Sequence, residues 1–354
     1  MQPMSDTKGS MVLLERMTDG TIICAEGYLF ELERRGYLQA GAFVPEVVLE
    51  HPDKVAQLHA EFVHAGSDVV QAFTYYAHRE KLRVIGREHH LEPLNRTALE
   101  VAARVAADTG TLFAGNVCNT NVFDPGDAER LRQVTGMFTE QVGWMAEAGV
   151  DVVIGETFWW GQEALVALEV IAAAGLPAVI TLAPHRSGAT REGWSYADTC
   201  RRLQDGGAQV VGLNCIRGPA TMLPLLDDIV AAVDVPVAAL PVPYRTTATE
   251  PTFQSLRDPA YPGELPGDRP FPTALDPFTC HRWEIADFTA AAHEAGVRWL
   301  GLCCGAGPHH LRAMAEALGR TPPGSRFSPD MSKHAFLGTD VRLARQEAGI
   351  SGQL

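Results

Sequence analysis

Short apolar runs rich in β-branched residues recur along the chain and alternate with longer stretches whose apolar residues have helical spacing. Uninterrupted apolar strands are expected where both faces of a parallel sheet are covered, and each intervening stretch is long enough for a crossover helix. Eight such alternations predict an α/β fold in which the strands close into a TIM (β/α)8 barrel. The predicted strands span residues 21–25, 68–73, 111–114, 151–154, 178–182, 209–213, 235–240 and 298–302.

Three of the intervening stretches show the helical pattern most clearly. Residues 45–65 begin with Pro45, which suits the first turn of a helix, and continue with apolar residues on one face. Residues 127–148 and 223–233 have the same amphipathic pattern. Each of these stretches is therefore predicted to be a helix that leads into the next strand.

Two stretches outside the regular alternation predict additions to the barrel. Residues 241–277, between the seventh and eighth strands, are rich in proline and polar residues and predict a long insertion at the catalytic rim, with a solvated loop of no function as the alternative. The polar tail predicts an arm that packs on the barrel or on a second subunit. The chain is thus divided into a flexible N-terminal segment (1–16), a barrel (17–320) and a C-terminal arm (321–354), and a homo-oligomer is expected.

The charge balance limits what the protein binds. The 354 residues include 43 acidic residues against 29 Lys and Arg, so the net charge is −14 at pH 7 with histidine neutral. This charge repels a phosphate backbone, which argues against nucleic-acid binding, and it does not disfavour a small cationic substrate. No stretch approaches the ~20 apolar residues of a membrane span, so no membrane association is expected.

The seven cysteines lie in a long chain with a polar N-terminus, a combination that argues against a disulfide framework. A reducing, cytoplasmic location is therefore predicted. A single cysteine is more often a small apolar core residue than a ligand. We interpret Cys24, Cys118, Cys200 and Cys280 in this way.

The other three cysteines follow predicted strands, at the end of the barrel where active sites of this fold lie. Cys215 follows the sixth strand, and Cys303 and Cys304 follow the eighth. Three thiolates with one open position form a catalytic zinc site, and zinc keeps a substrate thiol as the thiolate that attacks an activated methyl group. A redox pair is the remaining alternative. His309 and His310 begin a predicted helix and are interpreted as surface residues.

An acidic residue and several aromatic residues follow other strands. Glu156 ends the fourth strand, where an acidic side chain adds nothing to packing, so it is predicted to bind an ammonium group. Phe73, Tyr75 and Tyr76 follow the second strand and, with Phe43, predict an aromatic wall for a methylated cation. Packing at the rim is the alternative for half of these rings, and Tyr76 and Phe43 are the favoured substrate contacts.

These residues resemble a known family, the zinc-dependent homocysteine S-methyltransferases, over about residues 17–318. The GxNC and GxCCG elements are specific to the family as a whole, and the two N-terminal blocks are similar to its betaine branch. The resemblance is carried by ELERRGYLQAG (31–41), EHPDKVAQLHAEFVHAGSDVVQAFTYYA (50–77), GLNC (212–215), TCHRWEI (279–285) and GLCCG (301–305).

The resemblance implies a TIM barrel that binds homocysteine. It implies that Cys215, Cys303 and Cys304 hold Zn²⁺, that homocysteine binds the zinc through sulfur, and that Glu156 contacts the ammonium group of the amino acid and is catalytic. The implied partners are homocysteine and a methylated onium donor.

The chain departs from the family where the donor is expected. Ala25 and Glu26 stand where the family has Asp-Gly, and Gly27 is retained. Thr157 replaces a tyrosine of the betaine branch, and Phe43 replaces a tryptophan. Glu26, Gly27 and Thr157 are therefore predicted to line the substrate site, where Glu26 would repel a donor's carboxylate or pair with a donor's cation.

The predicted function is transfer of a methyl group from glycine betaine, or a related quaternary ammonium, to zinc-bound homocysteine, giving methionine and dimethylglycine. A sulfonium donor, dimethylsulfoniopropionate or S-methylmethionine, and a different thiol acceptor are alternatives with the same chemistry. An alternative outside the enzymes is a barrel that binds ligands without turnover, in which the Ala25-Glu26 replacement has removed the activity.

Overall fold

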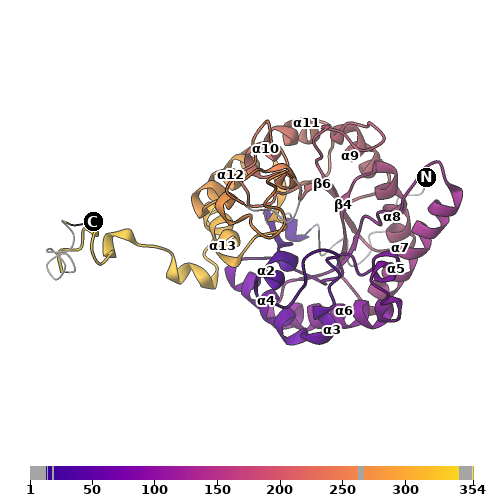
Figure 1. Ribbon diagram of the computed structural model, residues 1–354, viewed down its shortest axis with the longest axis horizontal. Helices are drawn as coiled ribbons and strands as arrows, with labels where there is room; N and C mark the ends of the chain where they lie inside the picture. Colours follow the sequence, from indigo (N-terminus) through magenta and orange to yellow (C-terminus); the bar gives the residue numbers. More distant parts are fainter. Residues whose placement is uncertain (1–12, 14, 18–19, 262–266, 343–352, 354) are drawn as a thin grey trace.

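The strands of the computed structural model, which describes residues 13, 15–17, 20–261, 267–342 and 353, close into one parallel barrel (Figure 1). Each strand pairs with its neighbours in chain order, and β8 pairs with β1. The predicted TIM barrel is therefore confirmed. The strands are β1 (Ile22–Ala25), β2 (Val69–Gln71), β3 (Leu112–Cys118), β4 (Val152–Phe158), β5 (Ala178–Leu182), β6 (Val210–Asn214), β7 (Val237–Leu240) and β8 (Val297–Leu302).

Helices surround the barrel, as the crossover connections of a parallel sheet require. Among the described residues, no helix is long and apolar enough to cross a membrane. The helices are α2 (Tyr28–Arg34), α3 (Val47–Glu50), α4 (Pro52–Ala65), α5 (Arg79–Val84), α6 (Leu91–Thr109), α7 (Ala128–Ala148), α8 (Gly161–Ala173), α9 (Tyr196–Asp205), α10 (Pro219–Met222), α11 (Leu226–Val230), α12 (Arg282–Glu294) and α13 (Pro308–Ala317).

The three helical stretches predicted most clearly are observed with different bounds. The stretch 45–65 is two helices, α3 and α4, because the proline at position 52 moves the preceding residue, His51, out of helical geometry (φ −141°, ψ 58°). The stretch 127–148 is α7, and the Asp127 side chain caps it by accepting hydrogen bonds from two backbone amides. The stretch 223–233 contains a short 3-10 turn and α11.

The side chains of each strand alternate between the barrel interior and the surrounding helices. Ile22 and Cys24 of β1 belong to the interior cluster, which includes the buried Trp299, whereas Ile23 and Ala25 pack in the layer between strands and helices. Polar side chains replace apolar ones in this interior only towards the carboxyl ends of the strands. That end therefore carries the chemistry.

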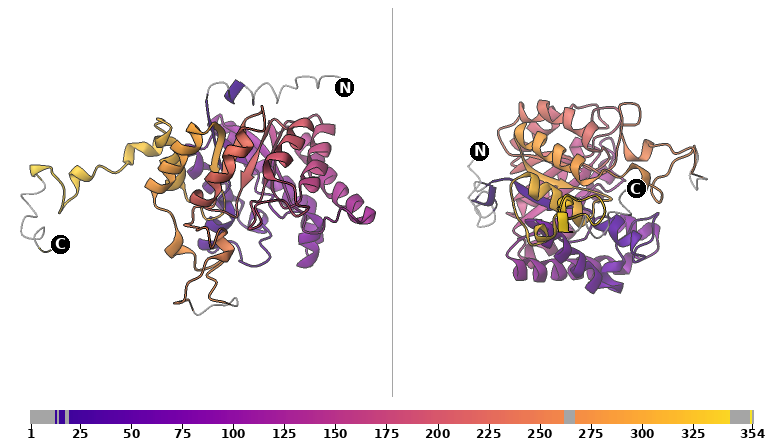
Figure 2. Two further views of the ribbon diagram at one scale, coloured as in Figure 1. Left: turned by 90° about the horizontal axis from the view of Figure 1, so that it is seen from above. Right: turned by 90° about the vertical axis from the view of Figure 1, so that its left-hand side faces the viewer.

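The predicted insertion, residues 241–277, leaves the carboxyl end of β7. Figure 2 shows this orange segment at the opposite end of the barrel from residues 15–17, which are drawn in indigo. The insertion is anchored by Tyr244, which is fully buried and stacks on Phe253 with ring centroids 5.9 Å apart. The backbone amide of Phe253 in turn donates to the carbonyl oxygen of Ile216, next to Cys215 (2.9 Å). The insertion is thus packed on the rim beside the thiols.

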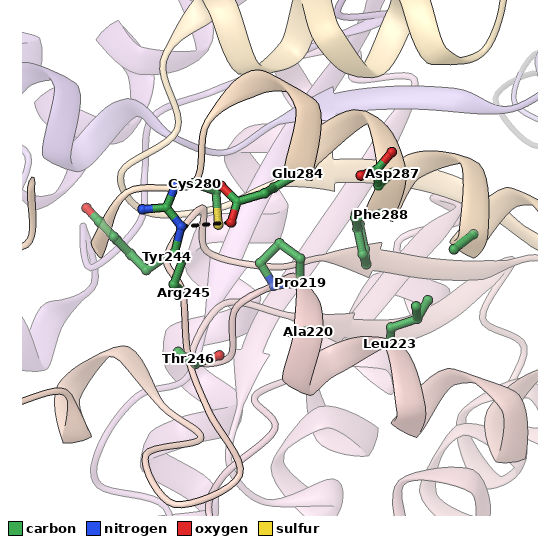
Figure 3. Close-up of a pocket in the computed structure, with 11 residues that line it drawn as sticks. Pro219, Ala220, Leu223, Tyr244, Arg245, Thr246, Cys280, Glu284, Asp287 and Phe288 are labelled. Carbon is green, nitrogen blue, oxygen red and sulfur yellow. Dashed lines mark hydrogen bonds and ion pairs between the residues drawn. The ribbon is translucent and has the colours of Figure 1, made fainter. Parts of the chain in front are cut away.

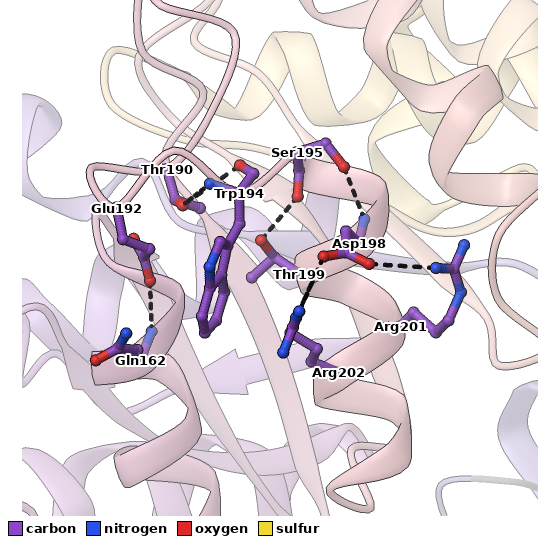
Figure 4. Close-up of polar contacts among 9 residues, drawn as sticks. All are labelled: Gln162, Thr190, Glu192, Trp194, Ser195, Asp198, Thr199, Arg201 and Arg202. Carbon is purple, nitrogen blue, oxygen red and sulfur yellow. Dashed lines mark hydrogen bonds and ion pairs between the residues drawn. The ribbon is translucent and has the colours of Figure 1, made fainter.

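The loop after β5 fixes the start of α8, the helix that follows β4. Figure 4 shows Glu192 directed at this helix, and its carboxylate accepts a hydrogen bond from the backbone amide of Gln162 (2.9 Å). Ser195 caps α9 by accepting from the amide of Asp198 (3.0 Å). The loop after β5 is therefore tied to the starts of both α8 and α9.

The C-terminal residues extend away from the barrel beyond α13 (Figure 1, yellow). Arg312 of α13 donates to the carbonyl oxygen of Gly324 (3.2 Å), so the start of the arm rests on the barrel. Beyond it, apolar side chains such as Met331 and Leu337 are exposed by 61% and 64%. The predicted flexible segment 1–16 lies mostly outside the described residues, and the three-part division of the chain stays a prediction.

Candidate active site

The three predicted thiols meet at one point at the carboxyl ends of β6 and β8. Cys215 directly follows β6, while Cys303 and Cys304 follow β8. The Sγ atoms of Cys215 and Cys304 lie 3.8 Å apart, those of Cys303 and Cys304 lie 3.9 Å apart, and all three lie within 4.8 Å of one another. The intervening strand aligns them, since the amide of Cys303 donates to the carbonyl oxygen of Pro241, just after β7 (2.9 Å).

These separations fit a tetrahedral metal ion. Bonds of about 2.3 Å from zinc to sulfur at tetrahedral angles place two sulfur atoms about 3.8 Å apart. A disulfide would instead require about 2.0 Å, and all seven cysteines are free. The thiols of Cys215, Cys303 and Cys304 therefore form a candidate metal site, and the other four cysteines are buried as predicted.

Several residues other than glycine, among them Cys215 and the residue after it, have positive φ angles. The φ angles of Cys215 and Ile216 are both 61°, and those of Thr157, Tyr76 and Phe43 are 61°, 60° and 58°. Positive φ is uncommon for residues other than glycine and is a clear outlier for a β-branched residue. Such conformations persist where the surrounding structure imposes them, and they are typical of functional sites.

Glu156 lies beside the thiols and accepts hydrogen bonds from several strands. Its Oε1 accepts from the side-chain amides of Gln71 (2.8 Å) and Asn116 (2.7 Å), which come from β2 and β3. Its Oε2 accepts from Asn214 of β6 (2.9 Å) and from the hydroxyl of Thr157 (3.3 Å). A register shift between Gly155 and Phe158 in the β4–β5 pairing turns this part of the strand.

Asn214 connects the two acidic residues of the site. Its Nδ2 donates to Glu156 and to the Oε2 of Glu26 (3.2 Å), and it lies 3.9 Å from the sulfur of Cys303. Its Oδ1 accepts from the amide of Thr157 (2.8 Å) and the hydroxyl of Thr181 (3.0 Å), which fixes the orientation of the side-chain amide. A single asparagine thus sets both carboxylates against the thiols.

Burial shapes the ionisation of these groups. Burial raises the pKa of Glu156 to about 7, although the amide donors of Gln71 and Asn116 oppose the shift. Burial and the neighbouring Glu156 raise the pKa of Glu26. Hydrogen bonds from Cys303 and Cys304 lower the pKa of Cys215, so Cys215 is the thiol of the three that loses its proton most readily.

A small cavity opens onto these groups, and its rings come only partly from the predicted aromatic wall. Phe73 and Tyr75 line it together with Glu26, Glu156, Cys303 and Cys304, as do Tyr28, Leu29 and Gln71, which were not predicted. No Lys, Arg or His is among the described lining residues. The cavity therefore combines aromatic faces with carboxylates and thiols.

The two favoured aromatic contacts, Tyr76 and Phe43, are not among these lining residues. The ammonium of Lys81 lies 3.9 Å from the ring centroid of Tyr76, so a cation of the protein itself covers one face of that ring. Phe43 packs on Phe30 with ring centroids 6.1 Å apart, in a cluster that continues to Phe253 of the insertion. The predicted substrate contacts of Tyr76 and Phe43 stay predictions, whereas Tyr75 lines the cavity together with Cys303 and Cys304.

Gly27 has a packing role at the turn after β1. A Cβ at this position would collide with the carbonyl oxygen of Ala306, so only glycine lets the turn after β1 approach the turn after β8. This approach brings Glu26 next to Cys303. His310, interpreted above as a surface residue, is instead buried, because its ring accepts from the amide of Gly307 (3.2 Å) and contacts the carbonyl oxygen of Cys280 (3.0 Å).

A larger cavity of about 540 Å³ lies outside the barrel, between α10 and α12. Figure 3 shows the ion pair of Arg245 and Glu284 at this cavity (2.7 Å), with Cys280 beside it and Pro219 and Phe288 along its wall. None of the three clustered cysteines lines it. The volume of a cavity therefore does not mark the site in this protein.

The sequence did not single out the amide side chains of Gln71, Asn116 and Asn214, which hold the carboxylates of the site. All three are buried and end apolar strands or lie within them. Their position in the sequence was a partial indication, because a polar amide side chain inside an apolar strand needs a buried hydrogen-bond partner. Asn116 was missed because β3 runs to Cys118, four residues beyond its predicted end.

A closed barrel whose strand ends bring three thiols together, two of which line a cavity with two carboxylates, defines a TIM-barrel enzyme with a candidate metal site. The family model for homocysteine S-methyltransferase matches residues 23–318. The chain therefore belongs to the homocysteine S-methyltransferase family, and it is a methyltransferase.

Relatives extend this match over almost the whole chain. Betaine–homocysteine S-methyltransferase 1 of Danio rerio is 34% identical over 348 residues, covering 97% of this chain and 83% of the relative. S-methylmethionine–homocysteine S-methyltransferase of Rattus norvegicus is 32% identical over 352 residues, covering 97% and 90%. The metallated form of the homocysteine methyltransferase MmuM from Escherichia coli shares the fold, with a TM-score of 0.65, 19% identity, and coverage of 87% of this chain and 99% of that one.

Proposed function

We propose that the protein transfers a methyl group from a methylated onium compound to the sulfur of homocysteine bound beside Cys215, Cys303 and Cys304. The observation that carries this proposal is the cluster of three thiols at the ends of β6 and β8, beside a cavity that Cys303 and Cys304 line together with two buried carboxylates and aromatic rings. Membership in the homocysteine S-methyltransferase family supports the thiol acceptor.

We infer that the three cysteines hold Zn²⁺. The sulfur separations of 3.8 and 3.9 Å suit tetrahedral zinc, and three protein ligands leave one position for a substrate sulfur. When bound, zinc would keep that sulfur as a thiolate near neutral pH.

The residues around the cysteines position the acceptor and the donor. Glu156 binds the ammonium group of homocysteine. The side-chain amides of Gln71, Asn116 and Asn214 hold the carboxylate of Glu156 in place. Tyr75 and Phe73 hold the donor cation against their faces, which attract methylated cations best where water is excluded.

Methyl transfer then needs no covalent enzyme intermediate. The sulfur–carbon bond forms as the carbon–nitrogen bond breaks, and the electron pair of the broken bond stays on nitrogen. Glycine betaine would give dimethylglycine, and homocysteine would give methionine. Holding the two reactants in line supplies much of the acceleration.

Glycine betaine is the leading donor, because the first relatives are betaine–homocysteine S-methyltransferases of 34–35% identity. A sulfonium donor is the second candidate, supported by the relative that is named for S-methylmethionine. Of the four replacements, Glu26 lines the cavity and Thr157 contacts Glu156, whereas Ala25 and Phe43 pack outside it. A donor panel is needed to separate the two candidates.

The test is an assay of zinc-loaded protein with homocysteine and a panel of betaines and sulfonium compounds. We expect methionine with at least one donor, and its absence with every donor would refute the proposal. Replacing Cys215 by Ala should abolish both zinc binding and turnover. A cytoplasmic location stays a prediction. The proposed homo-oligomer, supported by the exposed apolar side chains of the arm, is tested by sedimentation of the full chain.

A further inference from the structure

Glu26 is a buried acidic residue with one oxygen atom that no described residue satisfies. It follows β1 and continues the inward alternation of Ile22 and Cys24, so its side chain enters the barrel interior. Its backbone amide donates to Leu302 of β8 (3.0 Å), which fixes its position beside Cys303. The side chain is only 6% exposed, and it lines the cavity of the thiols.

Only one of the two carboxylate oxygens of Glu26 accepts a hydrogen bond from the described residues. Its Oε2 accepts from Asn214 (3.2 Å), whereas its Oε1 is buried without a hydrogen-bond partner among the described residues. A buried carboxylate oxygen without a partner costs free energy, so a donor from a ligand is expected at this point. Both oxygens of Glu156, in contrast, already accept from amides.

The two carboxylates face one common space. Oxygen atoms of Glu26 and Glu156 and the sulfur of Cys303 lie within 4.8 Å of one another, and no described Lys, Arg or His lines the cavity. Two buried carboxylates at this separation repel each other when both are ionised, and a cation between them removes that repulsion. The ligand that completes the site is therefore positively charged.

The open oxygen also restricts the kind of cation. A primary ammonium group carries three N–H donors, whereas a quaternary ammonium or a sulfonium group carries none. Only the primary ammonium can satisfy the open acceptor of Glu26. In the reaction with glycine betaine, which has no N–H donor, this group belongs only to the amino-acid acceptor, whose sulfur sits beside Cys303 and is joined to the nitrogen-bearing carbon by a short aliphatic chain. S-methylmethionine would carry the same group, so the donor KM in the test below is measured with glycine betaine.

We propose that Glu26 binds the ammonium group of the amino-acid thiol together with Glu156, and so selects the methyl acceptor and not the methyl donor. This inference rests on the proposed function. It assigns a role to a position where the family has glycine, and it replaces the expectation that Glu26 sets the donor. The preference is for thiols that carry an amino group over thiols that lack one.

The test compares homocysteine with 4-mercaptobutanoic acid, which has the same sulfur and carboxylate and lacks the amino group. Isothermal titration measures binding of each thiol to zinc-loaded wild type and to Glu26→Gln. We expect the variant to weaken homocysteine binding by at least about 10-fold, as expected for a charge-assisted hydrogen bond, and to leave the binding of the other thiol unchanged. Zinc content and the KM for the donor should also stay unchanged.

Two further variants and the activity of the wild type separate the outcomes. Glu163→Gln removes a buried carboxylate outside the cavity and should leave homocysteine binding as in wild type. Glu26→Gly places at this position the residue that the family has. The same binding measurement is made on this variant if Glu26→Gln does not fold. Failure of wild type to form methionine refutes the proposed function and not the binding role.

Four results would overturn the inference. They are unchanged homocysteine binding in Glu26→Gln, equal weakening for both thiols, a loss of zinc, or a rise in the donor KM without a change in homocysteine binding. The last two would make Glu26 a metal ligand or a donor residue.

Discussion

The thiol half and the carboxylate half of the site differ in how they are held. The thiols of Cys215, Cys303 and Cys304 contact mainly one another, and their positions follow from the ends of β6 and β8. The carboxylates of Glu26 and Glu156 are instead held by amide side chains from β2, β3 and β6. The metal end therefore depends on the strand ends, and the substrate end depends on a hydrogen-bond network.

The thiol half should fail completely when one sulfur is removed. Cys215→Ala should lose zinc and lower turnover by more than about 100-fold, which is the upper range for disturbing only an outer-shell partner of a metal. Metal analysis and methionine formation measure this. Cys200→Ala is the matched control, since Cys200 is fully buried in α9 away from the site, and it should keep both. Zinc retained at one per chain in Cys215→Ala would contradict the assignment.

The carboxylate half should fail in substrate binding with the metal retained. Glu156→Gln should raise the KM for homocysteine by about 10- to 100-fold, because an ammonium loses a charged partner, and it should keep its zinc. Glu163 is a fair comparison, since burial raises the pKa of both acids to about 7. Glu163→Gln should leave this KM unchanged, and an equal rise in both variants would show that the effect is general.

The raised pKa of Glu163 makes the stability of the folded protein depend on pH. Folded Glu163 keeps its proton up to about pH 7, whereas the unfolded group releases it near 4.5, so stability falls as the pH rises between these values. Glu163→Gln removes this loss and should be more stable than wild type by about 3 kcal/mol at pH 8, with no difference near pH 4. Urea unfolding at both pH values measures it, and equal stability at pH 8 would show that Glu163 ionises freely.

The smallest expected effect concerns the aromatic residues. Tyr75 lines the cavity, and loss of its ring in Tyr75→Leu should raise the donor KM by about 10-fold, as expected for a desolvated cation on an aromatic face. Phe43 packs on Phe30 instead, so Phe43→Leu should change this KM less than about 2-fold. The reverse order of effects would restore Phe43 as the donor contact.

The fold was predictable because the strand pattern is strong and local. All eight predicted strands are present, and the cysteines that follow two of them converge because the barrel closes. The break between α3 and α4 at His51 was also predictable from the sequence, because a proline follows His51 at position 52. Features that depend on strand position alone were therefore within reach of the sequence.

The directions of the rim side chains were not predictable. Tyr76, Phe43 and Thr157 have positive φ angles that the surrounding structure imposes, and these turn their side chains in ways that sequence spacing does not show. The links from Asn214 to Glu26 and Glu156 join residues up to 188 positions apart in the chain. Such contacts exist only once the barrel has closed.

X-ray absorption at the zinc edge tests the central claim most directly, because it counts the sulfur atoms bound to the metal. The measurement uses the zinc-loaded full chain with and without homocysteine. The account predicts three sulfur ligands without homocysteine and four with it, since the substrate sulfur takes the open position. A sulfur count that stays the same when homocysteine is added, or one below three without it, would contradict the account.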